Sequence, residues 1–342
     1  MKRHSSKRPT ISQVAERAGV SAGTVSNYLN GTVSVSPDRS SRIQEAIDAL
    51  HYVPDSNASS LRRKEARDIF ILTPDLNNMF YTKILRAYMD CAYQDGYNIS
   101  VSSYEYSRDL EKRMLSRLIS ARKGSLVVIF NGFGDEDLVE SLIQHDLRVI
   151  LADRNKTVAG ASSLSFDNEN VLFDLVRYLK EKGYKKLGLF TEPLLLENVR
   201  LRHDSFLKAA RYHGYSGKAI CVYCDETLVL NKMNQGYLYM RRILSETPRQ
   251  DLPDVWLASS DNLAIGILRA ITEAGYRVPE DFGLVGFDNL DISDFIQPAL
   301  TTINQDQVYF GTRLWDISRR VLKTNECIND TIMQNLIIRS SC

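Results

Sequence analysis

Residues 10–31 read TISQVAERAGVSAGTVSNYLNG. The first half of this stretch carries apolar residues at the spacing of one helix face, at Ile11, Val14, Ala15 and Ala18. Gly19 follows them, and glycine is common just beyond a helix end because it adopts left-handed backbone at little cost. Ser21 is a suitable cap for a second helix over residues 22–29, which Asn30-Gly31 ends. The stretch therefore predicts a helix-turn-helix unit.

A third helix completes a small all-α module over residues 1–54. It starts at Ser36-Pro37, with serine as the cap and proline in the first turn, and its apolar face consists of Ile43, Ala46, Ile47 and Leu50. The second helix exposes small polar residues, namely Ser21, Thr24, Ser26 and Asn27. Such side chains allow close approach to DNA and hydrogen bonds to phosphates. An inert helical bundle is the alternative, and these residues favour DNA binding over it.

Charge is divided unevenly along the chain. The 342 residues carry a formal net charge of +1, but residues 1–67 contain eleven Lys and Arg against six Asp and Glu. This segment is therefore at +5 and the remainder at −4. A basic module on an acidic body suits a polyanionic partner at one end of the protein.

The bulk composition is that of a globular protein that folds in water. Hydrophobic residues make up 44% and charged residues 25%, and the length suits two or three domains. No apolar run reaches the ~18 residues of a membrane span, and the basic N-terminus lacks the apolar segment of a secretory signal. We expect a cytoplasmic protein with free thiols. We interpret Cys221 and Cys224 as core thiols, because no second cysteine pair at metal-ligand spacing accompanies them.

From residue 68 onward, predicted strands and helices alternate. Strands are expected at residues 69–72, 97–103, 126–130, 148–152, 186–190, 219–223, 255–258 and 283–286. Helices are expected at residues 81–95, 110–122, 135–145, 173–182, 205–213, 235–244 and 262–274. This alternation implies parallel sheets with helices on both faces. Because the order occurs twice, we predict an α/β domain of two doubly wound subdomains with a ligand cleft between them.

Residues 10–61 resemble the headpiece of the lactose/galactose repressor (LacI/GalR) family of bacterial regulators. The matching string is Thr10-Ile11, Val14-Ala15, Ala18-Gly19-Val20-Ser21, Thr24-Val25-Ser26, Leu29-Asn30-Gly31 and Val35-Ser36. The resemblance implies that Ala22, Gly23 and Asn27 face the bases. It places phosphate contacts at Thr10, Ser21, Thr24, Ser26, Asn30 and Ser36. Ala22 and Gly23 depart from the larger donors common in the family, so most direct readout falls on Asn27, which can pair with adenine; Ala22 can contact a thymine methyl.

Residues 55–67 join the headpiece to the α/β domain. Their composition alone favours a plain linker, since an isolated helix this short does not persist in water. The resemblance implies instead a hinge helix that forms on operator DNA, with Ala58 and Leu61 on one face and Leu61 wedged into the minor groove. Folding coupled to DNA binding in this way supplies a switch.

The resemblance continues through residues 68–342. It is carried by Thr73-Pro74-Asp75, Phe80-Tyr81, Asp153-Arg154, Arg202 with Phe206, Gly286-Phe287-Asp288 and residues 298–303. It implies a domain like the periplasmic sugar-binding proteins, which binds an effector and forms a homodimer. One subdomain is expected at about residues 68–163 and 291–325, and the other at about 164–290 and 326–342. No leucine heptads mark a tetramerising tail, so we expect a dimer.

Residues at the ends of the predicted strands are candidates for binding the effector. Asp153 and Asp288 can accept hydrogen bonds from hydroxyls, and Arg202 can donate two in parallel. Phe80 and Tyr81 can pack on a ring face. Weaker candidates are Asn131, Asn198, Ser260 and Gln305. For each the alternative is an ordinary loop-capping residue. The set suits a sugar or a sugar acid, and it does not exclude the purines that the family also binds.

The expected function is that of a sequence-specific transcriptional regulator, a repressor by resemblance, whose binding to a pseudo-palindromic operator is controlled by a small-molecule effector of carbohydrate metabolism. A sugar-binding transport or sensor protein of the same α/β fold is the alternative, which the basic headpiece opposes. An enzyme is not expected, because G-x-G-x-x-G and Walker motifs and a nucleophile–histidine pair are absent. We expect no cofactor, metal site or membrane partner. The residues leave open which effector binds, whether it induces or co-represses, and which operator and genes are bound.

Overall fold

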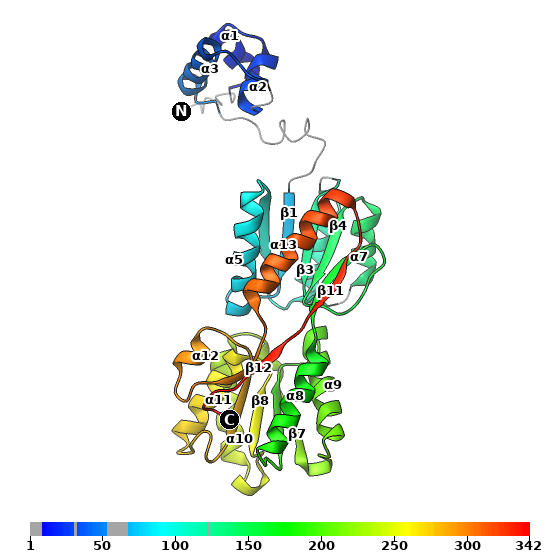
Figure 1. The fold of residues 1–342 in the computed structure, drawn as a ribbon, viewed down its shortest axis with the longest axis vertical. Coiled ribbons are helices and arrows are strands. Elements are labelled where there is room, and N and C mark those ends of the chain that lie inside the picture. Colours follow the sequence, from blue (N-terminus) through cyan, green and yellow to red (C-terminus); the bar gives the residue numbers. More distant parts are fainter. Residues whose placement is uncertain (1–8, 31–32, 53–67, 122, 134) are drawn as a thin grey trace, which may run out of the picture. The chain divides into compact units, whose positions relative to one another are not determined.

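The computed structural model describes residues 9–30, 33–52, 68–121, 123–133 and 135–342. The chain divides into two compact units, Met1–Ala66 and Arg67–Cys342. The first unit contains helices α1 to α3, and the second contains two six-stranded sheets with their helices (Figure 1).

The first unit is built from α1 (Ile11–Ala18), α2 (Ala22–Asn30) and α3 (Pro37–Leu50). Thr10 and Gln13 form a capping box at α1, in which each side chain accepts a hydrogen bond from the other residue's backbone N–H. Gly19 ends α1 with φ +63°. The buried core of this unit consists of Val14, Ala15, Ala18, Val25, Ile43 and Ala46. The predicted helix-turn-helix unit is confirmed.

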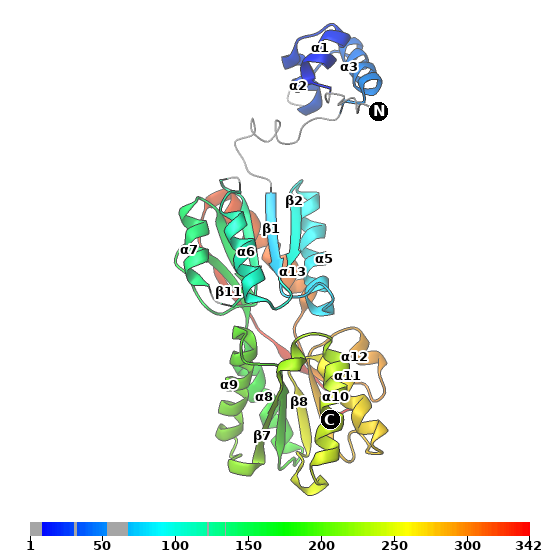
Figure 2. The same cartoon turned by 180° about the vertical axis from the view of Figure 1, so that it is seen from behind.

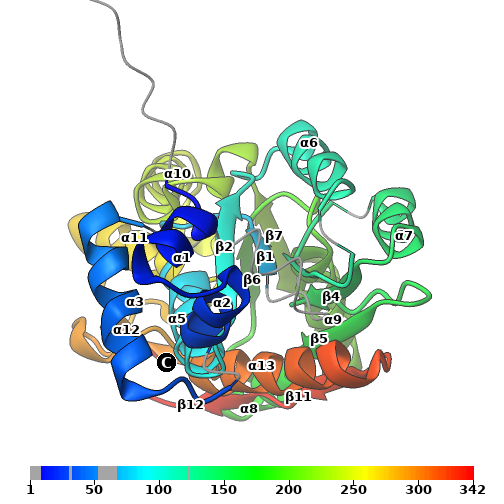
Figure 3. The ribbon, with the colours of Figure 1, turned by 90° about the horizontal axis from the view of Figure 1, so that it is seen from above.

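The second unit contains two subdomains, each built on one sheet. The strands of the first subdomain are β1 (Asp68–Thr73), β2 (Asn98–Ser103), β3 (Leu126–Phe130), β4 (Arg148–Ala152), β5 (Ser162–Phe166) and β11 (Asn329–Ile332). Its helices are α5 (Met79–Gln94), α6 (Arg108–Leu118), α7 (Glu136–Gln144) and α13 (Gln307–Thr324). The strand order is β11-β5-β4-β3-β1-β2, with parallel pairings throughout. α5 and α13 cover one face of the sheet, and α6 and α7 cover the other (Figure 3).

The second subdomain repeats this plan. Its strands are β6 (Leu187–Thr191), β7 (Ile220–Cys224), β8 (Val255–Ala258), β9 (Gly283–Asp288), β10 (Thr301–Asn304) and β12 (Asn335–Ile337). Its helices are α8 (Asn168–Glu181), α9 (Glu197–Tyr212), α10 (Lys232–Glu246), α11 (Asp261–Glu273) and α12 (Ile292–Phe295). The order is β12-β10-β9-β8-β6-β7, in which only the β10–β12 pairing is antiparallel among the described strands. α8 and α9 cover one face, and α10 and α11 the other (Figures 1 and 2). The predicted pair of doubly wound subdomains is confirmed.

The chain passes between the subdomains three times, after β5, after β10 and after β11 (Figures 1 and 2). The chain crosses after residues 166, 304 and 332, whereas the sequence places these crossings at about residues 163, 290 and 325. β10 belongs to the second sheet, although residues 291–325 were assigned to the first subdomain, and β11 belongs to the first sheet, although residues 326–342 were assigned to the second. β5 likewise extends past residue 163.

These three strands escaped prediction because they are short and rich in polar residues. β5 reads SSLSF, yet every residue in it is buried. Its hydroxyls are satisfied by a strand far along the chain: Ser163 Oγ donates to Asn329 Oδ1 at 2.8 Å, and the hydroxyls of Ser165 and Thr331 lie 3.3 Å apart. A partner so distant in sequence leaves no local pattern.

The five cysteines, all within the described ranges, form no disulfide. The prediction of core thiols is wrong for Cys221 and Cys224, since Cys224 is exposed and Cys221 is half-buried. The reason is that β7 is the edge of its sheet and has a neighbour on one side only. The described residues include no cluster of His, Cys, Asp and Glu suited to a metal ion. Over the same ranges, no helix combines the length and apolarity that crossing a membrane requires.

Candidate functional site

A small cavity between the two subdomains collects most of the candidate effector residues. Seven of the nine candidates line it: Phe80, Tyr81, Asn131, Asn198, Arg202, Ser260 and Asp288. The other two contact these lining residues. Asp153 accepts a hydrogen bond from Asn198 Nδ2 at 2.7 Å, and Gln305 Oε1 accepts one from Arg202 Nη2 at 2.9 Å. The cavity has a volume of about 20 Å³, the space of a single water molecule.

The parallel sheets place these side chains, because the carboxyl ends of their strands meet at the cleft. Asn131 follows β3, Asp153 follows β4, Ser260 follows β8, and Asp288 ends β9. Three of them have left-handed backbone, with φ of +50° at Asn131, +54° at Asp153 and +119° at Asp288. Such backbone is unfavourable for residues with a side chain and is concentrated at functional sites.

Arg202 spans several elements of the cleft from its position on α9. Its Nη1 donates to the carbonyl oxygen of Ser259 at 3.0 Å, and its guanidinium carbon lies 4.0 Å from the centre of the Phe287 ring. With the bond to Gln305, these contacts fix the guanidinium plane. The sequence predicted a helix only over residues 205–213, whereas α9 begins at Glu197. The additional turns carry Asn198 and Arg202 into the cavity wall.

The two aspartates of the cleft are protonated more readily than in water. Burial raises the pKa of Asp288 well above its usual value, although the Arg202 guanidinium opposes the shift. Burial also raises the pKa of Asp153 to about 6, against the lowering effects of Arg202 and of the hydrogen bond from Asn198. Both carboxyl groups are therefore held in a dry environment, where a hydrogen bond from a ligand hydroxyl is stronger than in water.

Sequence reasoning missed an ion pair in the same cavity. Glu192 follows β6, and its carboxylate pairs with the ammonium of Lys232, the first residue of α10. The Ser259 hydroxyl also donates to Glu192. Burial alone would raise the pKa of Glu192, but the Lys232 ammonium outweighs it and the pKa is lowered. Glu192 could have been found as another polar residue after a buried strand, whereas Lys232 had no such signal.

The first subdomain adds Asn78 and Tyr106 to the cavity wall; Asn78 belongs to the loop whose sequence resembles the family's first effector loop, and Tyr106 was missed. Asn78 caps α5, since its Oδ1 accepts a hydrogen bond from Phe80 N–H at 3.0 Å. The Lys232 ammonium lies 5.8 Å from the centre of the Tyr106 ring, so this cation–π contact links the two subdomains.

Several buried polar atoms around the cavity have no hydrogen-bond partner in the described part of the chain. They are Asn131 Oδ1, Asn198 Oδ1, Arg202 Nε and Gln305 Nε2. An unpaired buried polar group costs about 1–3 kcal/mol, so a cluster of them in one cavity requires an explanation. A ligand that both donates and accepts hydrogen bonds would satisfy them.

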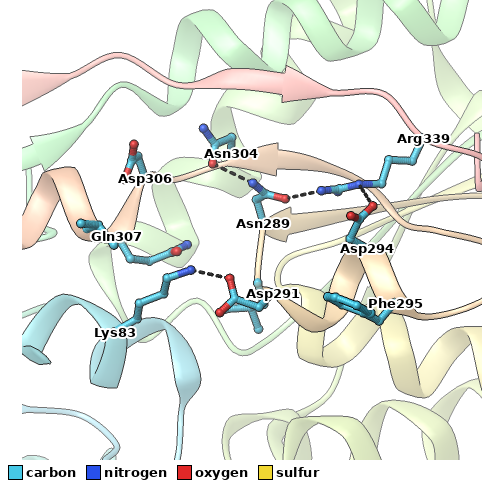
Figure 4. Close-up of a pocket in the computed structure, with 11 residues that line it drawn as sticks. Lys83, Asn289, Asp291, Asp294, Phe295, Asn304, Asp306, Gln307 and Arg339 are labelled. Atoms are coloured by element: carbon cyan, nitrogen blue, oxygen red, sulfur yellow. Dashed lines mark hydrogen bonds and ion pairs between the residues drawn. The ribbon is translucent and has the colours of Figure 1, made fainter. Parts of the chain in front are cut away.

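A second hollow, of about 470 Å³, lies beside α12 and the start of α13 (Figure 4). It is larger than the cavity, but four of its five charged side chains already form ion pairs, and the fifth, Asp306, caps α13. Lys83 binds Asp291, and Arg339 binds both Asp294 and Asn289. Phe295 borders it with 85% of its surface exposed. This hollow therefore resembles an exposed part of the protein surface more than it resembles a ligand-binding cavity.

The described candidate DNA contacts lie along α2 and at the starts of α1 and α3. Val25 faces the core, and Ala22 and Gly23 at the start of α2 are exposed. Ser21 caps α2 by accepting from Thr24 N–H at 3.1 Å, and Ser26 and Asn27 are partly buried on the same helix. Ser36 holds the cap position of α3 without a capping hydrogen bond from its side chain. Asn30 ends α2, while Ala58 and Leu61 lie outside the described residues.

Two family models match the chain. A model described as bacterial regulatory proteins of the lacI family matches residues 10–55, and a periplasmic binding protein-like domain matches residues 176–342.

Similar proteins extend over nearly the whole chain. The HTH-type transcriptional repressor PurR of Mannheimia succiniciproducens is 29% identical over 337 residues, which cover 97% of this chain and 98% of that protein. Catabolite control protein A of Priestia megaterium is 26% identical, with 95% and 96% covered. A crystal structure of the Lac repressor bound to ONPG in the repressed state superposes with a TM-score of 0.83 at 25% identity, covering 98% of this chain and all of that one. The Lac repressor dimer bound to operator and the anti-inducer ONPF gives a TM-score of 0.81 at 25% identity, with 98% and 99% covered.

Proposed function

Since the chain belongs to the LacI/GalR family of bacterial transcriptional regulators, we propose that its α/β unit binds a sugar or sugar derivative and thereby controls operator binding by the helix-turn-helix unit. The observation that carries this proposal is the convergence of the predicted effector residues on one cavity between the subdomains. Carboxyl groups, amides and a guanidinium surround the cavity beside the Phe80 and Tyr81 rings. Such a combination suits the hydroxyls and the apolar face of a sugar ring.

Helix α2 is the proposed base-reading element of a DNA-binding headpiece over residues 1–54. The exposed Ala22 and Gly23 let its first turn approach base edges, with Ala22 beside a thymine methyl, and Asn27, five residues after Ala22, pairs with adenine. We assign phosphate contacts to Thr10, Ser21, Thr24, Ser26, Asn30 and Ser36. We assign Ala58 and Leu61 to a hinge helix within residues 55–67 that inserts into the minor groove.

Residues 68–342 are the proposed effector-binding and dimerisation domain. An exposed apolar surface supports the dimer: Ile292, Phe295, Val308 and Tyr309 are all more than one-third exposed. Phe295 of α12 borders the hollow shown in Figure 4, and Val308 of α13 lines the same hollow. Clustered apolar residues of this size mark a protein–protein interface, and a second copy would cover them.

The small size of the cavity is the basis for the proposed control of DNA binding by the effector. A volume of about 20 Å³ holds no sugar ring, so a ligand must separate the two subdomains to enter. In a dimer, a change in the angle between subdomains changes the spacing of the two hinges, and with it the fit to two operator half-sites. We place this activity in the bacterial cytoplasm, where the operator DNA is.

Selection of duplexes from a random-sequence pool by the purified chain tests the DNA-binding half of the proposal, and the expected product is a palindrome. Adding monosaccharides, disaccharides, sugar acids and nucleobases one at a time to the selected complex tests the effector half. A sugar or sugar derivative should change operator affinity by about 5–150-fold, the usual range of coupling between two sites. No preference for any duplex at moderate salt would reject the first half, and a response to nucleobases alone would reject the second.

A further inference from the structure

A larger cavity, the outer groove, adjoins the small inner cavity at the mouth of the cleft. It has a volume of about 730 Å³, and Asn78 and Lys232 line both cavities. The first subdomain supplies one wall of the outer groove with residues 75–79, Ser103 and Glu105, and the second supplies the other with residues 230–234 and Asn262. A ligand held in the inner cavity therefore has a path past Asn78 and Lys232 into the outer groove.

Side-chain amides dominate the lining of the outer groove: Asn77, Asn78, Asn231, Asn234 and Asn262. Each amide offers donors and an acceptor, which matches sugar hydroxyls. Asn262 is only 8% exposed, and its Oδ1 has no hydrogen-bond partner within the described ranges. Leu76, Met79 and Leu230 add exposed apolar surface, on which the C–H face of a sugar ring can pack. The groove can therefore contact the hydroxyl groups and one apolar face of a sugar ring at the same time.

Charge in the outer groove disfavours an anionic ligand. The ammonium of Lys232 already pairs with the buried carboxylate of Glu192. Asp75 and Glu105 add two carboxyl groups to the lining. A phosphate or carboxylate entering the groove would face these groups without a free cation among the described residues that line it.

We propose that the effector is a neutral disaccharide or other glycoside. One ring enters the inner cavity as the subdomains separate, and the next ring lies in the outer groove. This inference rests on the proposed function, because it takes the inner cavity as the site of a sugar ring. Asn78 and Lys232 then lie at the linkage between the two rings, and Asn262 accepts a hydrogen bond from the second ring. The outer groove then distinguishes longer sugars from monosaccharides, which occupy only the inner cavity once the subdomains have separated.

Calorimetric titration of the full-length protein tests this with three classes of probe: glucose and galactose, the disaccharides maltose, cellobiose, lactose and melibiose, and glucose 6-phosphate. One disaccharide should bind at least about tenfold more tightly than its constituent monosaccharides, a difference of about 1.4 kcal/mol. Glucose 6-phosphate should bind more weakly than glucose.

Variants of residues that line the outer groove separate the two cavities. Asn234→Trp fills the outer groove from the exposed side of α10, so the advantage of the disaccharide should disappear while monosaccharide affinity changes less than about twofold. Leu238→Trp adds the same indole to the same helix outside the groove and should bind every probe as the wild type does. Asn262→Ala should reduce only disaccharide affinity, with an unchanged melting temperature, because its acceptor has no protein partner to lose.

The outcomes distinguish the two proposals. Equal affinity for monosaccharide and disaccharide, or undiminished disaccharide affinity in Asn234→Trp, would overturn the outer-groove assignment and leave the inner cavity as a sugar site. Tighter binding of glucose 6-phosphate than of any disaccharide would overturn the neutral character of the ligand. Failure of every sugar in the panel to bind would overturn both the groove assignment and the proposed effector class.

Discussion

Arg202 connects three parts of the cleft through one guanidinium. It donates to the loop after β8 at Ser259 and to Gln305 after β10, and it lies over the Phe287 ring of β9. These contacts leave Nε without a partner in the described part of the chain. A guanidinium whose orientation is already fixed loses little conformational entropy on binding a ligand. This preorganisation increases the affinity for the ligand.

Arg202→Ala should remove the effector response while leaving operator affinity in the absence of ligand within a few-fold of wild type. The variant leaves the carbonyl of Ser259 and the amide of Gln305 without a donor, which should cost about 1–3 kcal/mol of folding stability. Operator binding with and without the active sugar, together with thermal unfolding, measures both effects. Arg200→Ala, an exposed position on the same helix, is the control. A normal response at the usual sugar concentration in Arg202→Ala would remove this residue from the site.

Asp153 gives the cleft a pH dependence with a definite sign. Burial raises its pKa to about 6, so the folded protein binds this proton more tightly than the unfolded chain does. The stabilisation from protonation is fully present below the unfolded pKa of about 3.9 and is lost as the pH rises through about 6. Asp153→Asn should therefore exceed wild type in unfolding free energy by about 2–3 kcal/mol at pH 8, with the advantage lost near pH 4. Urea unfolding across this range measures it, and the exposed Asp137→Asn should show no such trend.

At the scale of elements, the start of a helix determines what each unit can contact. α2 begins with Ala22 and Gly23, whose small side chains leave the first turn open, and Ser21 caps the helix from outside. α9 begins earlier than its apolar pattern indicates, and the added turns bring Asn198 and Arg202 to the cleft. In α9 the first turns place Asn198 and Arg202 in the cavity wall, and the later turns pack Phe206, Ala209 and Ala210 in the core.

Asn27→Ala tests α2 as the base-reading element. The variant should lose about 1–3 kcal/mol of specific operator affinity, because a bidentate pair with adenine is lost. Its affinity for a random duplex should not change, since that binding comes from phosphate contacts. Fluorescence anisotropy with the selected operator and with a scrambled duplex of equal length measures both. An equal loss on both duplexes would assign Asn27 to the backbone instead of the bases.

At the scale of the whole α/β unit, three crossings join the subdomains, and the cavity proposed as the effector site lies between them. The crossings allow the subdomains to change their angle as two rigid bodies, which is the kind of motion that a ligand between them can bias. In the proposed dimer, the exposed apolar residues of α12 and α13 would transmit this motion to a second copy.

Phe295→Asp should disrupt the proposed dimer. It places a charge where an 85% exposed aromatic ring is available to an interface, and losing such an anchor costs about 2 kcal/mol or more of association free energy. Sedimentation should show a shift toward monomer, and operator affinity should fall with it because each half-site is bound by one copy. Tyr212→Asp, also highly exposed but on α9, is the control and should remain dimeric. A Phe295→Asp protein that sediments as wild type would place the interface elsewhere.

The sequence by itself determined the helix-turn-helix unit, the two doubly wound subdomains and nine residues that the structure places in or beside one cavity. These features follow from local pattern: apolar spacing and caps define helices, and polar residues that follow buried strands collect at one edge of a parallel sheet.

Only the tertiary structure decided the rest. β5 is a buried polar strand whose hydroxyls bond to the more exposed β11, 166 positions along the chain, and the Glu192–Lys232 pair joins residues 40 positions apart. The edge position of β7 exposes Cys224 in a strand that reads as core. Each of these features depends on which segments of the chain pack against one another. The physical reason is that hydrogen bonding and burial are determined by neighbours in space, and the local composition of the chain does not encode those neighbours.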